Sequence, residues 1–165
     1  MNRLDNPEEI LTRLIDDYAD MIFRIALVQL KNWHDAEDIV QRVFMQLYES
    51  WPDFTSEEHI KFWLIRITIH RCKDYLKSAW KKNTAPLQEN IPGQNLEISD
   101  ITRAVLNLPP NKRQVILLHY YLGYNIREIA QLTGKKASAV ATMLHRSRKQ
   151  LKLDMSDDET VTGGR

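Results

Sequence analysis

One segment of the chain combines cations with aromatic rings in a way that suits contact with nucleic acid. From Glu57 to Lys82 there are seven Lys or Arg residues against three Asp or Glu residues. Cations can neutralise phosphates, and the rings between them can meet the flat faces of bases. This composition is typical of proteins that bind single-stranded or opening DNA. The residues are Lys61, Phe62, Trp63, Arg66, Arg71, Lys73, Tyr75 and Lys77.

A second basic segment has the pattern of a helix-turn-helix. Ile129 is one of several small apolar contacts that let two helices cross closely, and Gly134 suits the tight turn between them. Val140 and Leu144, four residues apart, predict the buried side of the second helix. A plain helical hairpin has the same periodicity. Nine Lys or Arg residues against one acidic residue in 111–153 favour DNA binding over that alternative.

No residue pattern indicates catalysis or metal binding. The five histidines, at positions 34, 59, 70, 119 and 145, lack metal-ligand spacing, and Cys72 is the single cysteine. The sequence has no glycine-rich phosphate loop and no nucleophile motif of the hydrolases. We therefore expect no enzyme activity, no catalytic residues, no metal and no cofactor.

Composition and charge fit a globular protein with two kinds of surface. Of 165 residues, 43% are apolar and 27% charged. The net charge of +1 hides an acidic segment, 1–56, with 5 basic and 11 acidic residues. Such segregation indicates separate surfaces for a polyanion and for a basic partner, although solvated faces that differ in sign would give the same counts. The acidic amino terminus, without an apolar signal core, predicts a cytoplasmic location.

Apolar residues recur at helical spacing in three segments before Lys82. The expected helices end near Leu30, before Pro52 and near Lys81. Their predicted capping residues are Asn6, Asp35 and Thr55, the last in a capping box with Glu58.

Shorter helical segments follow a stretch rich in Asn, Pro and Gly. We expect helices at 100–107, 111–122, 125–132 and 136–152. The predicted fold class is all-α, with two small helical domains joined by a flexible linker and a helix-turn-helix in the second. The predicted boundaries are 1–81 for the first domain, 82–99 for the linker, 100–153 for the second domain and 154–165 for a disordered acidic tail.

Taken in order along the chain, these motifs resemble the extracytoplasmic-function (ECF) sigma factors, which direct bacterial RNA polymerase to promoters. The resemblance covers about Leu11 to Leu153. It implies that 1–81 is sigma region 2 and 100–153 is sigma region 4. The matching segments are Asp35–Gln41 with Val43-Phe44 (polymerase-binding helix), Trp63-Leu64, Ile67 and Asp74–Lys77 (promoter-opening helix), and Leu108–Leu118 with Glu128–Ala130, Val140, Leu144, Arg146 and Arg148 (promoter-reading domain).

The resemblance implies a polymerase-binding face on the second helix. Asp38 and Gln41, three residues apart and hence on one face, match family positions that dock on the clamp helices of the largest polymerase subunit. Asp35 and Arg42 flank them, and Arg42 departs from the acidic residue often found there. Asp35 also favours the amino end of its helix electrostatically.

For the minus-ten element, the resemblance implies contacts from the third helix, with an unpaired base captured there and by the loop Trp51–Ser56. Trp63, by its spacing, is predicted to pack in the core rather than to stack on a base. The predicted minus-ten contacts are Lys61, Arg66, His70 (where the family usually has asparagine), Arg71, Lys73 and Lys77.

For the minus-thirty-five element, the resemblance places Ala139, Ala141 and Met143 where the family commonly has threonine, lysine and arginine. These side chains donate no hydrogen bonds, so we predict weak readout that depends on phosphate contacts and groove shape. The remaining candidate contacts are Lys135, Lys136, Ser138, Thr142, His145, Arg146, Arg148 and Lys149.

The implied partners are core RNA polymerase (the clamp helices of the largest subunit and the flap of the second largest), promoter DNA and an anti-sigma factor. The chain would be a monomer when free, or 1:1 with the anti-sigma factor, with no small-molecule substrate and no membrane insertion. Two alternatives remain: a free-standing helix-turn-helix regulator, which would be a dimer on a palindromic site, and a sigma-like polymerase-binding protein without promoter activity. The second is favoured by Arg42, Ala139, Ala141 and Met143.

Overall fold

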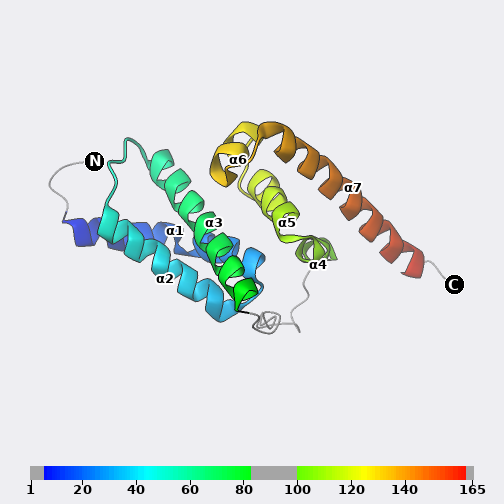
Figure 1. Cartoon of the computed structure of the whole chain (residues 1–165), viewed down its shortest axis with the longest axis horizontal. Coiled ribbons are helices and arrows are strands. Elements are labelled where there is room, and N and C mark those ends of the chain that lie inside the picture. Colours follow the sequence, from blue (N-terminus) through cyan, green and yellow to red (C-terminus); the bar gives the residue numbers. More distant parts are fainter. Residues whose placement is uncertain (1–5, 83–99, 163–165) are drawn as a thin grey trace. The chain divides into compact units, whose positions relative to one another are not determined.

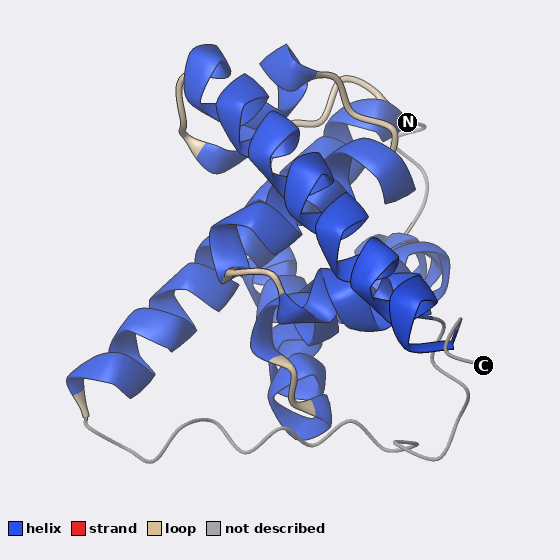
Figure 2. Cartoon of the chain, turned by 90° about the vertical axis from the view of Figure 1, so that its right-hand side faces the viewer, coloured by secondary structure: helices blue, strands red, loops and turns tan. Residues whose placement is uncertain are grey.

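The computed structural model describes residues 6–82 and 100–162, with side chains described up to residue 152. All regular elements in these ranges are helical, as Figure 2 shows. The chain folds as two compact units, Met1–Asn90 and Ile91–Arg165. The predicted fold class is therefore confirmed. Apart from Lys82, the predicted linker lies outside the described residues.

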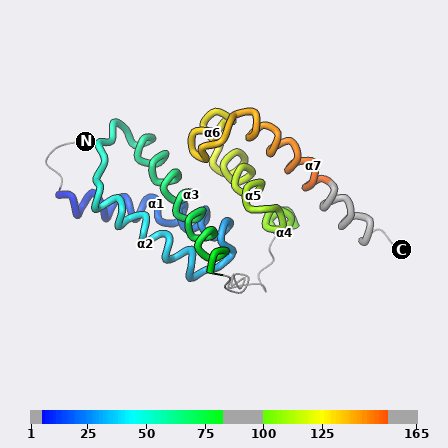
Figure 3. Tube along the Cα trace, viewed as in Figure 1, coloured from blue at the N-terminus to red at the C-terminus, as the bar shows by residue number. Residues whose placement is uncertain are grey.

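The first unit is a three-helix domain. Helices α1 (Pro7–Leu30), α2 (Trp33–Ser50) and α3 (Glu57–Lys81) each contact the other two (Figures 1 and 3). Their apolar faces enclose one core, whose burial stabilises the domain by roughly 25 cal/mol per Å² of apolar surface. Ile15 is one of the apolar residues at helical spacing in the first predicted helix, yet it is 36% exposed. The core includes Leu14, Ile22, Ala26, Ile39, Val43, Leu47, Ile60 and Leu64.

The starts of α2 and α3 differ from the sequence prediction. Asn32, not Asp35, caps α2, because its Oδ1 accepts the N–H of Asp35 at 3.0 Å. Ser56, not Thr55, caps α3, because its Oγ accepts the N–H of His59 at 3.1 Å. In both cases the side-chain oxygen that reaches the third amide of the helix decides the cap. Asp35 consequently lies inside the first turn of α2.

The second unit contains four α-helices within its described residues. They are α4 (Asp100–Asn107), α5 (Pro110–Ile116), α6 (Ile126–Thr133) and α7 (Ala137–Thr162), and α7 contacts the other three (Figure 1). A π-helical turn, Leu117–Tyr121, continues α5, so the predicted helix 111–122 is present but changes its hydrogen-bonding pattern. Buried residues of this unit include Ala104, Leu108, Val115, Leu118, Ile129, Leu132, Val140 and Leu144.

The predicted helix-turn-helix is formed by α6 and α7. Asn125 and Glu128 cap α6 reciprocally, since each side chain accepts the backbone N–H of the other, at 2.9 and 2.8 Å. Gly134 ends α6 in the left-handed region, with φ 69°, which confirms its predicted role in the turn. Val140 and Leu144 are fully buried and fix α7 by its inner face, as predicted.

The prediction of a disordered tail from residue 154 is wrong for residues 154–162, because α7 continues to Thr162. The sequence offers a reason: no Pro or Gly occurs between Ala137 and Thr162, so nothing in it breaks the helix. Residues 163–165, which include the next glycines after Gly134, lie outside the described residues.

Candidate functional site

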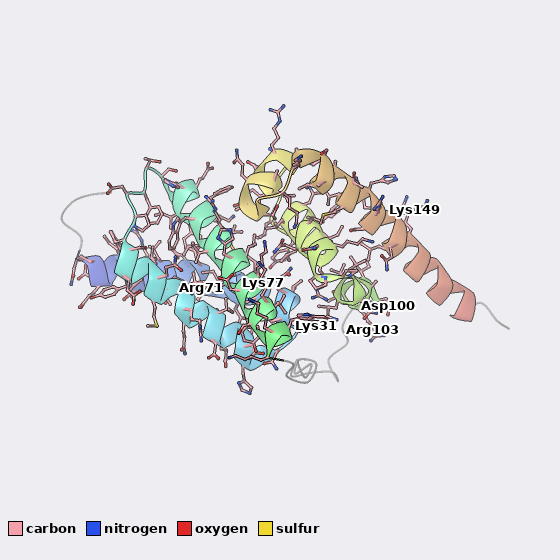
Figure 4. All side chains as sticks on the ribbon, viewed as in Figure 1. Lys31, Arg71, Lys77, Asp100, Arg103 and Lys149 are labelled. Atoms are coloured by element: carbon pink, nitrogen blue, oxygen red, sulfur yellow. The ribbon has the colours of Figure 1, made fainter. Side chains whose placement is uncertain are left out.

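Four of the predicted minus-ten residues form one exposed row along α3, which we call the α3 stripe: Arg66, His70, Lys73 and Lys77. Their spacing of four, three and four residues places them on the same face of a helix, and all four are exposed. Within the described residues, none of the four side chains makes an ion pair or a hydrogen bond. At 1.5 Å per residue the stripe is about 16 Å long, close to five base steps of DNA. Figure 4 shows Lys77 on this helix.

Arg71 does not belong to the stripe. Its Nε and Nη2 donate to Oε1 of Gln46 at 3.1 and 2.7 Å, so it connects α3 to α2 inside the first unit (labelled in Figure 4). The side chain is half-buried. Lys61 is also half-buried, and its position five residues before Arg66 places it on another face. The structure therefore separates these two cations from the other predicted minus-ten residues.

The exposed side of α2 carries a second row, which we call the α2 face: Asp38, Gln41, Met45 and Tyr48. The spacing of three, four and three residues aligns them. Met45 and Tyr48 are each 59% exposed, unusual for large apolar side chains on a small domain. Sequence reasoning identified the polar half of this row and missed the apolar half, although the same spacing could have revealed it. Arg42, also exposed, lies beside the row.

Asp35 is half-buried and serves the fold. It accepts a side-chain hydrogen bond from Tyr75 of α3, which connects the amino end of α2 to α3. Burial, that hydrogen bond and the charges of Asp35 and Asp38 raise the pKa of Tyr75 from 10.0 to about 12. The neutral phenol is thus the form that the folded domain favours.

Replacing Tyr75 with phenylalanine is expected to lower the free energy of unfolding by about 1 kcal/mol at pH 7, because one hydrogen bond is lost while the ring remains. Because the pKa of Tyr75 is higher in the folded chain than in the unfolded chain, the neutral phenol makes its full contribution to stability below pH 10. This contribution is lost as the pH rises through 12. The difference between parent and Tyr75→Phe should therefore narrow over that range. Urea unfolding followed by tryptophan fluorescence measures it, since all four tryptophans are in the first unit. A difference that does not change with pH would contradict this role of Tyr75.

A cavity of about 190 Å³ lies between α1, the loop before α3 and the first turn of α3. Leu14, Phe54 and Ile60 give it apolar walls, and Arg13, Asp17, Thr55, Ser56 and Glu57 supply polar groups at its rim. The ring of Phe54 stands edge-on to that of Trp63, with centroids 5.8 Å apart, and Trp63 packs against the core as predicted. A planar ring with hydrogen-bonding edges suits such a lining.

The outer side of α7 carries the third row: Ser138, Thr142, His145 and Lys149, again spaced by four, three and four residues and all exposed. Arg146 adjoins it and is exposed, and Figure 4 shows Lys149 on this helix.

Other residues predicted near the minus-thirty-five contacts are distributed differently. Lys136 and Arg148 are exposed, Arg148 on the side of the row opposite to Arg146, and Lys135 is half-buried in the turn. Three residues on the predicted groove-facing side depart from the family pattern, and of these only Ala139 is exposed. Ala141 and Met143 are half-buried beside the core face. The departure from the family pattern therefore affects one exposed position and two half-buried ones.

The side chains of Arg113 and Cys72 are both buried. Arg113 is 4% exposed, and its Nη1 donates to the carbonyls of Leu106 and Leu108 at 3.0 and 3.1 Å, joining α5 to the end of α4. It is one of the basic residues counted in the second segment, yet it adds nothing to the surface. Burial raises the pKa of the Cys72 thiol to about 12, so the thiolate is disfavoured.

Within 6–82 and 100–162, no three His, Cys, Asp or Glu side chains gather as metal ligands would. Over the same ranges, no helix is both long and apolar enough to span a membrane.

Two family models match the chain. The model of sigma-70 region 2 matches residues 14–82, and the model of sigma-70 region 4 matches residues 98–151. Together these matches cover more than half of the chain, in the order expected. The chain belongs to the sigma-70 family of RNA polymerase sigma factors, in its ECF group, and the resemblance seen in the sequence is confirmed.

Individual relatives agree with this assignment. RNA polymerase sigma factor SigV of Bacillus subtilis is 24% identical, over 96% of this chain and 99% of SigV. The ECF sigma factor SigW of the same species is 26% identical, with 91% of each chain covered. The fold is similar to that of the sigma factor RpoE of Bartonella quintana, solved with the anti-sigma factor NepR, with a TM-score of 0.73, 17% identity and coverage of 90% and 98%. The chain is therefore a transcription initiation factor of the ECF type.

Proposed function

We propose that this sigma factor divides its work among three rows of side chains: the α2 face binds polymerase, the α3 stripe binds the minus-ten element, and the outer row of α7 binds the minus-thirty-five element. The observation that carries this proposal is the pair of rows in the first unit. One combines the carboxylate of Asp38 and an amide with apolar side chains, the other is basic, and both are exposed. Rows of opposite character on neighbouring helices suit two partners of opposite charge.

The α2 face is the proposed contact for the clamp helices of the largest polymerase subunit. Asp38 and Gln41 can pair with arginine side chains through charge-assisted hydrogen bonds. Met45 and Tyr48 would extend the contact with apolar surface, the usual composition of an interface centre. Arg42 would lie at the rim. Asp35 would act by holding α2 to α3 through Tyr75. We further propose that the second unit contacts the flap of the second largest subunit.

The α3 stripe and the cavity form the proposed minus-ten site. Arg66, Lys73 and Lys77 would bind phosphates, and His70 would offer a hydrogen-bonding edge between them. The cavity beside Phe54 would receive an unpaired base, because it joins apolar walls to a polar rim in the loop that the family resemblance assigns to base capture. This arrangement would hold opened DNA without any chemical step on the protein.

At the minus-thirty-five element we propose contacts from Ser138, Thr142, His145, Arg146 and Lys149. The hydroxyl of Thr142 donates to the carbonyl of Ser138 at 3.0 Å, so within the described residues this donor is already engaged. The cationic side chains would then supply most of the contacts to DNA, and readout of the minus-thirty-five element would depend on phosphates and groove shape.

Regulation and location follow from the proposed role. An anti-sigma factor that covers the α2 face would prevent polymerase binding, and RpoE of Bartonella quintana was solved in complex with the anti-sigma factor NepR. We propose that the chain is cytoplasmic, where polymerase and DNA are found, and a monomer when free or 1:1 with that inhibitor. Polymerase would supply all the chemistry.

Run-off transcription from genomic fragments tests the function. Core polymerase from the same organism, supplemented with this chain, is expected to start transcripts at discrete sites that core polymerase alone does not use. Scrambling the upstream element of such a promoter should weaken initiation less than scrambling the minus-ten element. No initiation despite tight polymerase binding would favour a sigma-like protein without promoter activity. A dimer that binds a palindrome without polymerase would favour a free-standing regulator.

A further inference from the structure

The side chain of Trp80 is 87% exposed at the end of α3, more than any other large apolar residue in the described chain. An indole buries well over 100 Å² in most proteins, so leaving it in water forgoes a large hydrophobic gain. The other tryptophans, Trp33, Trp51 and Trp63, are half-buried, and each packs against neighbouring side chains. Trp80 therefore contributes little to the fold of the first unit.

The position of Trp80 continues the α3 stripe. It lies three residues after Lys77 and seven after Lys73, so it falls on the same helix face as the four stripe residues. It would extend the row from Arg66 to about 21 Å, or about six base steps of DNA.

The charged residues that flank Trp80 along the chain are all positive. Lys77, Lys81 and Lys82 are all exposed, and no acidic residue occurs between Tyr75 and Lys82. An exposed ring among cations is the arrangement with which proteins hold nucleic acid, since the cations neutralise phosphates and the ring meets bases or sugars. A partner whose surface complements the acidic α2 face would be repelled here.

We infer that Trp80 is a DNA-contact residue: its indole packs on a base or sugar of promoter DNA at the far end of the α3 stripe. This inference rests on the proposed function of the stripe and adds a contact that no cation provides. Trp80 would add affinity through ring contact while the neighbouring lysines hold the backbone in place.

The test uses holoenzyme assembled from the full chain and core polymerase on a promoter from the run-off assay. Trp80→Ala is expected to lower promoter affinity roughly 5- to 100-fold, as for stacking aromatic residues elsewhere. The dependence of log affinity on log salt should keep its slope, because the indole carries no charge. Trp80→Phe should keep most of the affinity. Lys77→Ala is the matched control on the same stripe, with a slope reduced by about 0.9.

A photo-reactive p-benzoylphenylalanine at position 80 tests the contact directly. Irradiation is expected to cross-link it to promoter DNA, whereas the same group at position 45, on the α2 face, should cross-link to polymerase. Equal promoter affinity of the parent and Trp80→Ala, or cross-links from position 80 to protein alone, would overturn the inference while the parent still binds the promoter. If the parent holoenzyme binds no promoter, the inference fails together with the proposed function.

Discussion

Asp38→Ala is expected to lower the affinity of the chain for core RNA polymerase by on the order of 100-fold. The side chain is exposed at the amino-terminal end of the α2 face, where it can pair with a cation of the partner. Truncating one member of a charge pair in an interface costs roughly 2–5 kcal/mol, because the other charge is left without its partner. Gln41→Ala, which removes a neutral amide, should cost about tenfold. Competition of labelled parent chain with each variant for core polymerase measures both.

The control for this experiment is Asp16→Ala. Asp16 is an exposed aspartate on α1, outside the α2 face, and its removal changes the net charge of the chain by the same amount. If Asp16→Ala weakens polymerase binding as much as Asp38→Ala, the effect is long-range charge attraction and the proposed docking face is wrong. Unchanged binding by both α2 variants would equally contradict it.

Neutralising Arg66, Lys73 and Lys77 together with alanine is expected to give the second large effect. Holoenzyme carrying the triple variant should bind promoter DNA more weakly by on the order of 1000-fold or more, since each of the three lost hydrogen bonds to a charged group is worth at least about 1.5 kcal/mol. The slope of log affinity against log salt should fall by about 2.7, because three phosphate contacts no longer release counterions. Affinity for core polymerase should remain that of the parent.

Arg71→Gln is the matched control on the same helix. It also removes a cation of α3, but Arg71 is bonded to Gln46 of α2. The variant should lower the stability of the first unit and leave the salt slope of promoter binding close to that of the parent. A slope reduced as much per charge as in the triple variant would mean that Arg71 contacts DNA after all. In that case the assignment of Arg71 to the contact between α3 and α2, and not to the α3 stripe, would be wrong.

Much of the fold could be predicted because helical periodicity is local information. The spacing of Val140 and Leu144, and the glycine at 134, define the helix-turn-helix before any packing is known. The cap at Asn6 is confirmed, since its Oδ1 accepts the N–H of Glu8 at 3.3 Å. The predicted caps at Asp35 and Thr55 were wrong because another candidate capping residue lay close to each of them. Only the backbone conformation shows which side-chain oxygen reaches the third amide of the helix.

The residue types of the candidate site could be predicted from the sequence. Which of these residues lie together on the exposed surface could be predicted less well. Composition identified basic residues on the third helix, but tertiary contacts decided that Arg71 bonds to Gln46 and that Arg66, Lys73 and Lys77 remain in solvent. The same holds for Arg113, counted as basic surface and found buried against two carbonyls.

The sequence by itself determined the helices, the order of the two sigma regions and the chemical types of the proposed contact residues, because these depend on neighbours along the chain. The tertiary structure decided which of those side chains have a partner within the protein. Asp35 and Tyr75 are forty residues apart in sequence, and only the packing of α2 on α3 joins them. Packing also left Met45, Tyr48 and Trp80 in solvent, where periodicity alone assigns no role to an apolar side chain.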